Sequence, residues 1–271
     1  MNKWLIIDAP YLCHRAKYVF GDLSYEGSAT GVIYGVLKDV LSFQKRFKTD
    51  KVIFCWDSKY SIRKTIYPQY KQNRTHKEYT KEEIAFDLQF REQIKKLRKV
   101  YIPLIGWKNN FIQTGYEADD LIASICSHFD DEDEAVIISA DQDLFQLIRP
   151  FISMFNPQTK KETTLQSFRE EYKTVPMGWI HAKAIAGCSS DNIDGIAGVG
   201  INTAIKYILG ELKPSRKLQA IIDGKKITDR NWDLVCLPLQ GTSTFTLQKD
   251  KFSKQGWQEV CTLLGMKSLK E

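Results

Sequence analysis

The sequence predicts an α/β protein with a largely parallel central sheet flanked by helices. Three short, continuously apolar runs, at residues 4–8, 52–57 and 135–141, are typical of strands that are buried on both faces. Each run ends on an aspartate, and segments with helical periodicity separate the runs. Such alternation indicates parallel strands joined by helices, with functional groups gathered beyond the carboxyl ends of the strands.

The other elements are expected in the following order: helices at residues 31–47, at residues 80–99 and from residue 121, a strand at residues 151–155, a turn at Asn156-Pro157 and a helix from about Thr164. Thr80 and Glu83 have the spacing of a capping box, which marks a helix start. The helix from residue 121 has one apolar stripe, which predicts packing against a core. Beyond Lys213 the pattern shows only generic amphipathic segments.

Composition limits the class of protein. The chain has 271 residues, 43% of them hydrophobic, which is enough for one large domain or one domain with an appendage. No apolar run reaches the length of a membrane span or a signal peptide, so we expect a soluble intracellular protein without membrane association. The six cysteines are far apart and indicate neither a disulfide framework nor a zinc site. The net charge of +6 weakly favours an acidic partner such as nucleic acid.

Carboxylates collect at one predicted edge of the sheet. The strand ends contribute Asp8, Asp57 and Asp141, which is followed by Asp143, and the helix start in GYEADDL contributes Glu117, Asp119 and Asp120. Each acid alone fits a helix cap or the favourable end of a helix dipole. Together, two carboxylates about 4 Å apart repel by roughly 4 kcal/mol at an effective dielectric near 20. Hard divalent cations are the natural counter-charge, and all-oxygen ligation selects Mg²⁺ or Mn²⁺.

Two further stretches indicate nucleic-acid binding. Residues 60–79 mix basic and tyrosine side chains, which suit phosphates and the stacking of unpaired bases, although a solvated charged surface is the alternative. Gly195, Gly198 and Gly200 predict a tight turn between two helices, with exposed backbone N–H groups that can bind a duplex phosphate. A glycine turn without function is the alternative there.

These motifs together resemble the 5′-nucleases of the flap endonuclease superfamily, in their bacterial and phage form, with the 5′-3′ exonuclease domain of bacterial DNA polymerase I nearest in pattern. The resemblance extends from Asp8 to about Leu209 through IID, WDS, YPQYKQNR, GYEADDL, SADQDLFQL and SSDNIDGIAGVG. It implies a two-metal, structure-dependent 5′-3′ exonuclease or 5′-flap endonuclease of DNA replication or repair. It also implies a nuclease core at residues 1–176 with a helical arch at about residues 60–80. A helix–three-turn–helix DNA-binding region and the C-terminal segment would then occupy residues 177–271.

The resemblance also implies residue roles. The expected ligands of the first metal are Asp8, Asp57, Glu117 and Asp119, and those of the second are Asp141, Asp143 and Asp191, with Asp119 near both. Asp120 is included as a ligand, directly or through water, because it pairs with Glu117 at i+3. The residues expected to contact the reacting phosphate and strand end are Arg63, Tyr70, Lys71 and Arg74. Those expected to hold the duplex, with a bound K⁺, are Gly195, Gly198, Gly200, Asn202, Thr203 and Lys206.

One position departs from the pattern. Where relatives have G-D-S-S-D, this chain has Cys188 in place of an acid of the second metal site. Because Mg²⁺ prefers hard oxygen ligands, the thiol predicts weak binding of the second ion. Asp194, where proline is common, compensates in part or extends a loop. The alternative is that Cys188 only packs against the glycine turn, while Asp191 and water complete the site.

The expected partner is DNA with a 5′ single strand or flap joined to duplex, and an RNA primer hybrid is a further candidate. We expect a monomer in the cytoplasm of a bacterium, or of the host cell if a phage encodes it. Two alternatives remain open from the sequence. One is a DNA-junction binding protein of the same fold whose catalysis has decayed through Cys188. The other is a small RNase of the PIN type, which shares the acids but lacks the glycine turn.

Overall fold

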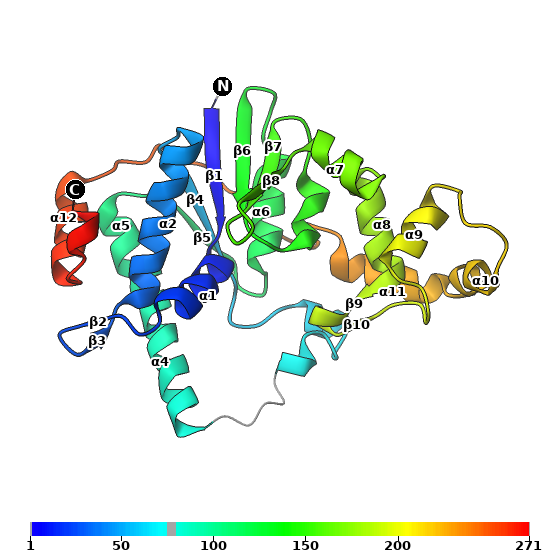
Figure 1. The fold of residues 1–271 in the computed structure, drawn as a ribbon, viewed down its shortest axis with the longest axis horizontal. Helices are drawn as coiled ribbons and strands as arrows, with labels where there is room; N and C mark the ends of the chain where they lie inside the picture. Colours follow the sequence, from blue (N-terminus) through cyan, green and yellow to red (C-terminus); the bar gives the residue numbers. More distant parts are fainter. Residues whose placement is uncertain (1, 75–79, 271) are drawn as a thin grey trace.

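A computed structural model describes residues 2–74 and 80–270. Its centre is a six-stranded sheet with the order β5-β4-β1-β6-β7-β8 (Figure 1). The strands are β1 (Asn2–Asp8), β4 (Lys51–Trp56), β5 (Asn109–Ile112), β6 (Asp133–Ile138), β7 (Ile152–Asn156) and β8 (Lys161–Thr163). All neighbours pair in parallel except β7 and β8. The predicted α/β class is confirmed, and β8 is an addition that the sequence pattern did not reveal.

The strands are apolar on both faces because helices cover both sides of the sheet. Successive strand residues face opposite sides: Ile6 and Ile53 join a core beneath α6 (Ala118–Ser127). Leu5 and Phe54 join a second core, whose helices include α1 (Ala9–Phe20) and α2 (Gly31–Phe47). The predicted bounds of α2 are confirmed. Neither α1 nor the hairpin of β2 (Ser24–Tyr25) and β3 (Ser28–Ala29) was predicted.

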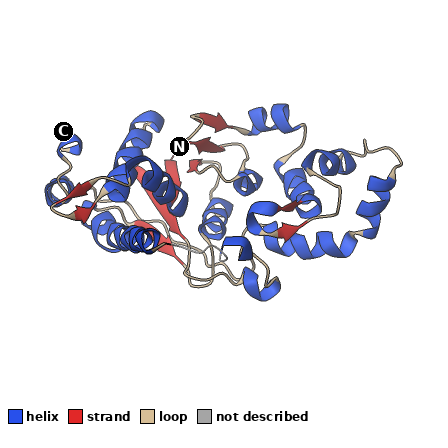
Figure 2. Ribbon diagram, turned by 60° about the horizontal axis from the view of Figure 1, so that its bottom comes forward, coloured by secondary structure: helices blue, strands red, loops and turns tan. Residues whose placement is uncertain are grey.

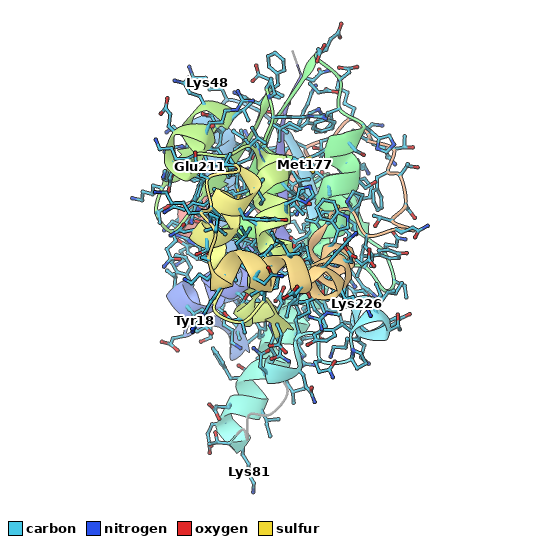
Figure 3. All side chains as sticks on the ribbon, turned by 90° about the vertical axis from the view of Figure 1, so that its right-hand side faces the viewer. Tyr18, Lys48, Lys81, Met177, Glu211 and Lys226 are labelled. Carbon is cyan, nitrogen blue, oxygen red and sulfur yellow. The ribbon has the colours of Figure 1, made fainter. Side chains whose placement is uncertain are left out.

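Helix α4 (Lys81–Lys96) projects from the body, and Lys81 at its start lies far from the sheet (Figure 3). Its predicted capping box is present, because Thr80 and Glu83 exchange side-chain and backbone hydrogen bonds. The buried amide of Gln93 accepts a hydrogen bond from the backbone N–H of Val32 at 2.9 Å, which ties α4 to the start of α2. A π-helical turn (Leu97–Tyr101) and α5 (Ile102–Ile105) continue the segment to β5.

A helical lobe lies beside the carboxyl-end region of the sheet (Figure 2). Its elements are α7 (Leu165–Tyr172), α8 (Pro176–Ala186), β9 (Gly187–Cys188), η4 (Ser189–Asp191), β10 (Ile193–Asp194), α9 (Ile201–Ile208), α10 (Arg216–Asp223) and α11 (Lys225–Val235). A small core between α8 and α11 includes Ile180, Leu234 and the side chains of Tyr67 and Tyr70. The segment after β4 is therefore built into this lobe.

The chain returns from the lobe to the sheet through a strap, residues 237–253, that follows the open edge at β5. Asn109 of β5 exchanges two hydrogen bonds of 2.8 Å with the backbone of Gln248. Helix α12 (Lys254–Leu263) and η5 (Lys267–Leu269) then pack into the core of α1 and α2. The C-terminal segment, which the sequence left without an assigned role, thus packs with the nuclease core through α12. Within the described residues, no helix has the length and apolar character needed to cross a membrane.

Candidate metal centre

The acids that end the three central strands are held by hydrogen bonds to helix starts and to one neighbouring strand end. Asp8 caps α1, accepting the backbone N–H of Tyr11 at 3.1 Å and the hydroxyl of Ser139 at 2.6 Å. Asp57 accepts the backbone N–H of Ala118, at the start of α6, at 2.8 Å. Asp141 caps the 3₁₀ helix η3 (Gln142–Leu147). As predicted, parallel register brings these acids to one edge of the sheet.

Burial and mutual repulsion oppose charge on these carboxylates. Burial, with further repulsion from Asp57, raises the pKa of Asp8 to about 7, although the hydroxyl of Ser139 acts against it. Burial, followed by the charge of Asp143, raises the pKa of Asp141 to about 6. Burial also raises the pKa of Asp119, which is repelled by Asp141, Asp8 and Asp57. Such a group is stabilised by a cation, and its oxygen donors fit a hard divalent ion.

Glu117 differs from the aspartates because cations surround it. The hydroxyl of Tyr70 donates to its carboxylate at 2.8 Å, and the ammonium of Lys71 does so at 3.0 Å. Burial acts to raise the pKa of Glu117, but the charges of Lys71 and Arg63 outweigh burial and leave this pKa lowered. Glu117 is therefore ionised and faces the same edge as the strand-end acids.

Asp120 and Arg63 form a buried ion pair behind this edge. The Arg63 guanidinium donates to both Asp120 oxygens, at 2.6 and 2.7 Å, and Asp120 also accepts the backbone N–H groups of Glu117 and Leu239. Asp120 is fully buried and Arg63 is 2% exposed. These contacts contradict two expectations: both Asp120 oxygens are occupied by four N–H donors and are not available to a metal, and Arg63 is buried between Asp120 and the carbonyl of Leu234 and cannot reach bound DNA.

The loop after α3 (Arg63–Ile66) brings the other predicted cations to the acids. The backbone N–H of Lys71, in a left-handed conformation at φ 54°, donates to the carbonyl of Asp191. The Arg74 guanidinium, in η1 (Gln72–Arg74), pairs with the Asp191 carboxylate at 2.7 Å and keeps 57% of its side chain exposed. Tyr70 is buried rather than available for base stacking. Residues 75–79 of the predicted arch lie outside the described residues.

A compact group of possible metal ligands lies beside Asp141, which is repelled by two of its members, Asp143 and Asp191. Ligand atoms of Asp143, Cys188 and Asp191 all lie within 4.8 Å of one another. The ammonium of Lys183, on α8, is 2.7 Å from Asp143. Asp194 lies outside this group, and the hydroxyl of Tyr67 donates to it at 3.4 Å. The sequence did not predict the roles of Lys183, which pairs with Asp143, and of Ser139, which donates to Asp8. For Ser139 the one indication was its position two residues before Asp141, in Ser139-Ala140-Asp141.

The three glycines between α8 and α9 have different environments. A Cβ on Gly195 would lie 2.0 Å from the carbonyl of Ala186, so this glycine permits close backbone packing. Gly198 has φ +74°, and a Cβ on Gly198 or Gly200 would meet no described atom within 4 Å. The open side continues onto α9, where the predicted contacts Asn202 and Lys206 are exposed and Thr203 is half-buried.

The fold and the converging acids are those of a metal-dependent nuclease, and comparisons with known proteins give the family. The family profile described as the 5′-3′ exonuclease N-terminal resolvase-like domain matches residues 3–173. The 5′-3′ exonuclease of Buchnera aphidicola (subsp. Schizaphis graminum) is 34% identical over 205 residues, covering 74% of this chain and 68% of the relative. This chain belongs to the 5′-3′ exonuclease family.

Solved structures agree with this assignment. The T5 5′-exonuclease with bound zinc has a TM-score of 0.74 and 26% identity, covering 88% of this chain and 90% of that one. The T5 D15 flap endonuclease, solved in complex with DNA and metal ions, has a TM-score of 0.74 at 23% identity over 99% of this chain and 97% of that one. The second likeness, at this identity, concerns the fold.

Proposed function

We propose that the chain cleaves DNA at or near the junction between a 5′ single strand and a duplex, with two Mg²⁺ or Mn²⁺ ions. One observation carries this proposal. Lys71 and Arg74 lie on a loop that contacts both the acids and the segment leading to the glycine turn. A phosphate placed between that loop and the acids would belong to a strand whose duplex part can reach the turn. RNA primer hybrids are secondary candidates in the same proposal.

The first ion would be held by Asp8, Asp57, Glu117 and Asp119, and the second by Asp141, Asp143 and Asp191. Bound divalent ions supply an activated water and stabilise charge on the departing oxygen. Ser139 fixes the Asp8 carboxylate by its hydrogen bond at 2.6 Å. Lys71 and Arg74 pair with the carboxylates of Glu117 and Asp191 in this structure. When metal ions bind those carboxylates, the two cationic side chains would be free to pair with the phosphate and stabilise the negative charge that develops on it.

The remaining parts of the proposal concern the surroundings of the reaction. The glycine turn would hold duplex phosphates through backbone N–H groups, with a K⁺ ion between turn and phosphate. The nuclease core at residues 1–176 and the DNA-binding region within residues 177–271 would then bind different parts of one substrate. We also propose a monomer in the cytoplasm. The nuclease family gives no support to the alternative of a binding protein without catalysis.

The test compares end-labelled 5′-flap, 3′-flap, blunt duplex and RNA–DNA substrates, with and without Mg²⁺. We expect cleavage of the 5′-flap that requires the metal and is abolished in Asp8→Ala and Glu117→Ala. Both variants should bind the flap as tightly as the native protein or more tightly, because each removes a negative charge near a polyanion. Cleavage in EDTA, or by Asp8→Ala, would overturn the proposal.

A further inference from the structure

The second ligand group has a composition unlike the first, because a sulfur atom stands among its oxygens. Cys188 is 9% exposed, and its Sγ lies 3.0 Å from the hydroxyl of Ser190 and 3.7 Å from the ammonium of Lys183. Asp143 Oδ1 is buried and has no hydrogen-bond partner among the described residues, although the Lys183 ammonium is 2.7 Å away as an ion pair without hydrogen-bond geometry. The group thus has a buried oxygen and a buried sulfur, with ligand atoms of Asp143, Cys188 and Asp191 within 4.8 Å of one another.

We propose that Asp143, Cys188 and Asp191 form a site for a thiophilic divalent cation, such as Zn²⁺, Co²⁺ or Cd²⁺, and that this site discriminates against Mg²⁺. The inference rests on the proposed function, because it concerns the second of the two metal positions. It differs from that proposal in assigning Cys188 as a ligand and in assigning a different ion preference to each position.

Charge explains the discrimination. Mg²⁺ prefers hard oxygen and gains little from the sulfur, so it finds two carboxylates, one of which already pairs with Lys183. A thiophilic ion displaces the thiol proton to solvent and binds a thiolate. The three ligands then carry three negative charges, which balance the dication and the Lys183 ammonium together. Charge balance and ligand type therefore both favour the soft ion.

The two existing counter-ions differ in how easily they can leave. The Arg74 side chain is 57% exposed, so it can turn away from Asp191 toward solvent or substrate. The Lys183 side chain is 16% exposed and lies on α8 between Asp143 and Cys188. An incoming cation must therefore bind beside the Lys183 ammonium. Ligand atoms around one tetrahedral zinc ion are about 3.4–3.8 Å apart, given Zn–S and Zn–O lengths of about 2.3 and 2.1 Å, so side-chain rotations that bring the three ligand atoms about 1 Å closer suffice.

The experiment titrates the purified protein with Cd²⁺ and records the ultraviolet absorption of sulfur-to-metal charge transfer, followed by competition with Mg²⁺. We expect a band in the native protein that is absent in Cys188→Ser and Cys188→Asp and unchanged in Cys236→Ser. Cys236, in the same lobe, is half-buried and outside the ligand group, which makes it the matched control. Mg²⁺ should fail to remove the band until it is present in large excess.

Calorimetry gives the complementary result. Cys188→Ser should weaken Zn²⁺ binding by at least the roughly 10–100-fold that follows loss of an outer-shell partner of a metal ligand, whereas Cys188→Asp and Lys183→Met should strengthen Mg²⁺ binding. A band that persists in both Cys188 variants, or that Mg²⁺ removes at equal concentration, would overturn the inference. Equal melting temperatures of the native protein and Cys188→Asp exclude unfolding as the cause of a lost band. Native protein that cleaves a 5′-flap in Mg²⁺ without a Cd²⁺ band refutes this inference alone, whereas a band without cleavage of any substrate refutes the proposed function alone.

Discussion

In the absence of metal, the stability of this protein should fall as pH rises from about 4 to 7. The carboxyl of Asp8, whose pKa is raised to about 7 by burial, holds its proton more tightly in the folded protein than in the unfolded chain. Stability falls with pH wherever the folded state binds more protons, which for Asp8 is the interval between about 4 and 7. Asp141, raised to about 6 mainly by burial, acts in the same direction.

The magnitude follows from the size of the shift. Moving the pKa of Asp8 from 3.8 to about 7 corresponds to about 4 kcal/mol at 1.36 kcal/mol per unit. The contribution of Asp141 does not simply add, because the acids repel one another and titrate as a group. For a chain near this size, about 2–4 °C per kcal/mol gives a fall in Tm of roughly 10 °C. Glu117 has a lowered pKa, so its stabilising contribution is lost only in more acidic solution.

The assay is thermal unfolding in EDTA at several pH values, repeated with saturating Mg²⁺. We expect Mg²⁺ to raise Tm strongly at pH 8 and little at pH 5, because a ligand of the folded state stabilises it by mass action. Asp8→Asn should raise the metal-free Tm most at pH 8 and clearly less at pH 5, where only part of the cost of ionising the unfolded carboxyl has developed. Asp22→Asn, at an exposed position, is the control and should change neither value. A metal-free Tm that is constant or rises over this interval would refute the reasoning.

Three further outcomes are expected from single substitutions. Arg63→Met, which leaves Asp120 buried without its partner, should cost about 3–5 kcal/mol, and Arg63→Met with Asp120→Leu should recover much of it in denaturant unfolding. Gly195→Ala should lower Tm, because the added Cβ would lie 2.0 Å from the carbonyl of Ala186. Gly200→Ala should keep Tm, because its Cβ meets no described atom, but it should weaken duplex binding in a fluorescence-anisotropy titration if the glycine turn holds duplex phosphates. Lys71→Ala should lower kcat far more than it weakens duplex binding, and the opposite division would contradict its proposed contact with the reacting phosphate.

The parts of the fold that the sequence predicted are those in which local pattern and tertiary environment agree. The apolar runs before Asp8, Asp57 and Asp141 are strands because only a site covered on both faces buries every residue of such a run. Their shared orientation then places the acids at one edge without further information. The capping box of Thr80 is an equally local signal, and the structure contains it.

The errors have long-range causes. The sequence suggested that Arg63 is an exposed DNA contact. Its actual partner, Asp120, is 57 residues away, and no local sequence pattern indicates that the two side chains pair. Asp120 was predicted to be a metal ligand because it belongs to a cluster of acids. It is the next residue after Asp119 in the first turn of α6, and its side chain is buried in the protein. The strap could not be predicted from the sequence. It is held to β5 by the side chain of Asn109 rather than by the regular backbone pairing that gives a strand its alternating pattern.

The strap at residues 237–253 has a consequence for the behaviour of the protein in concentrated solution. An uncovered parallel edge at β5 would offer unpaired backbone groups to the edge of another molecule, which is a common route to aggregation. Gln248 occupies that edge through Asn109, and Lys251 donates its backbone N–H to the carbonyl of Gly106 just before β5. The strap that returns the chain from the lobe therefore also prevents another strand from pairing with β5. A variant in which the strap is detached should keep its helical lobe folded but should self-associate.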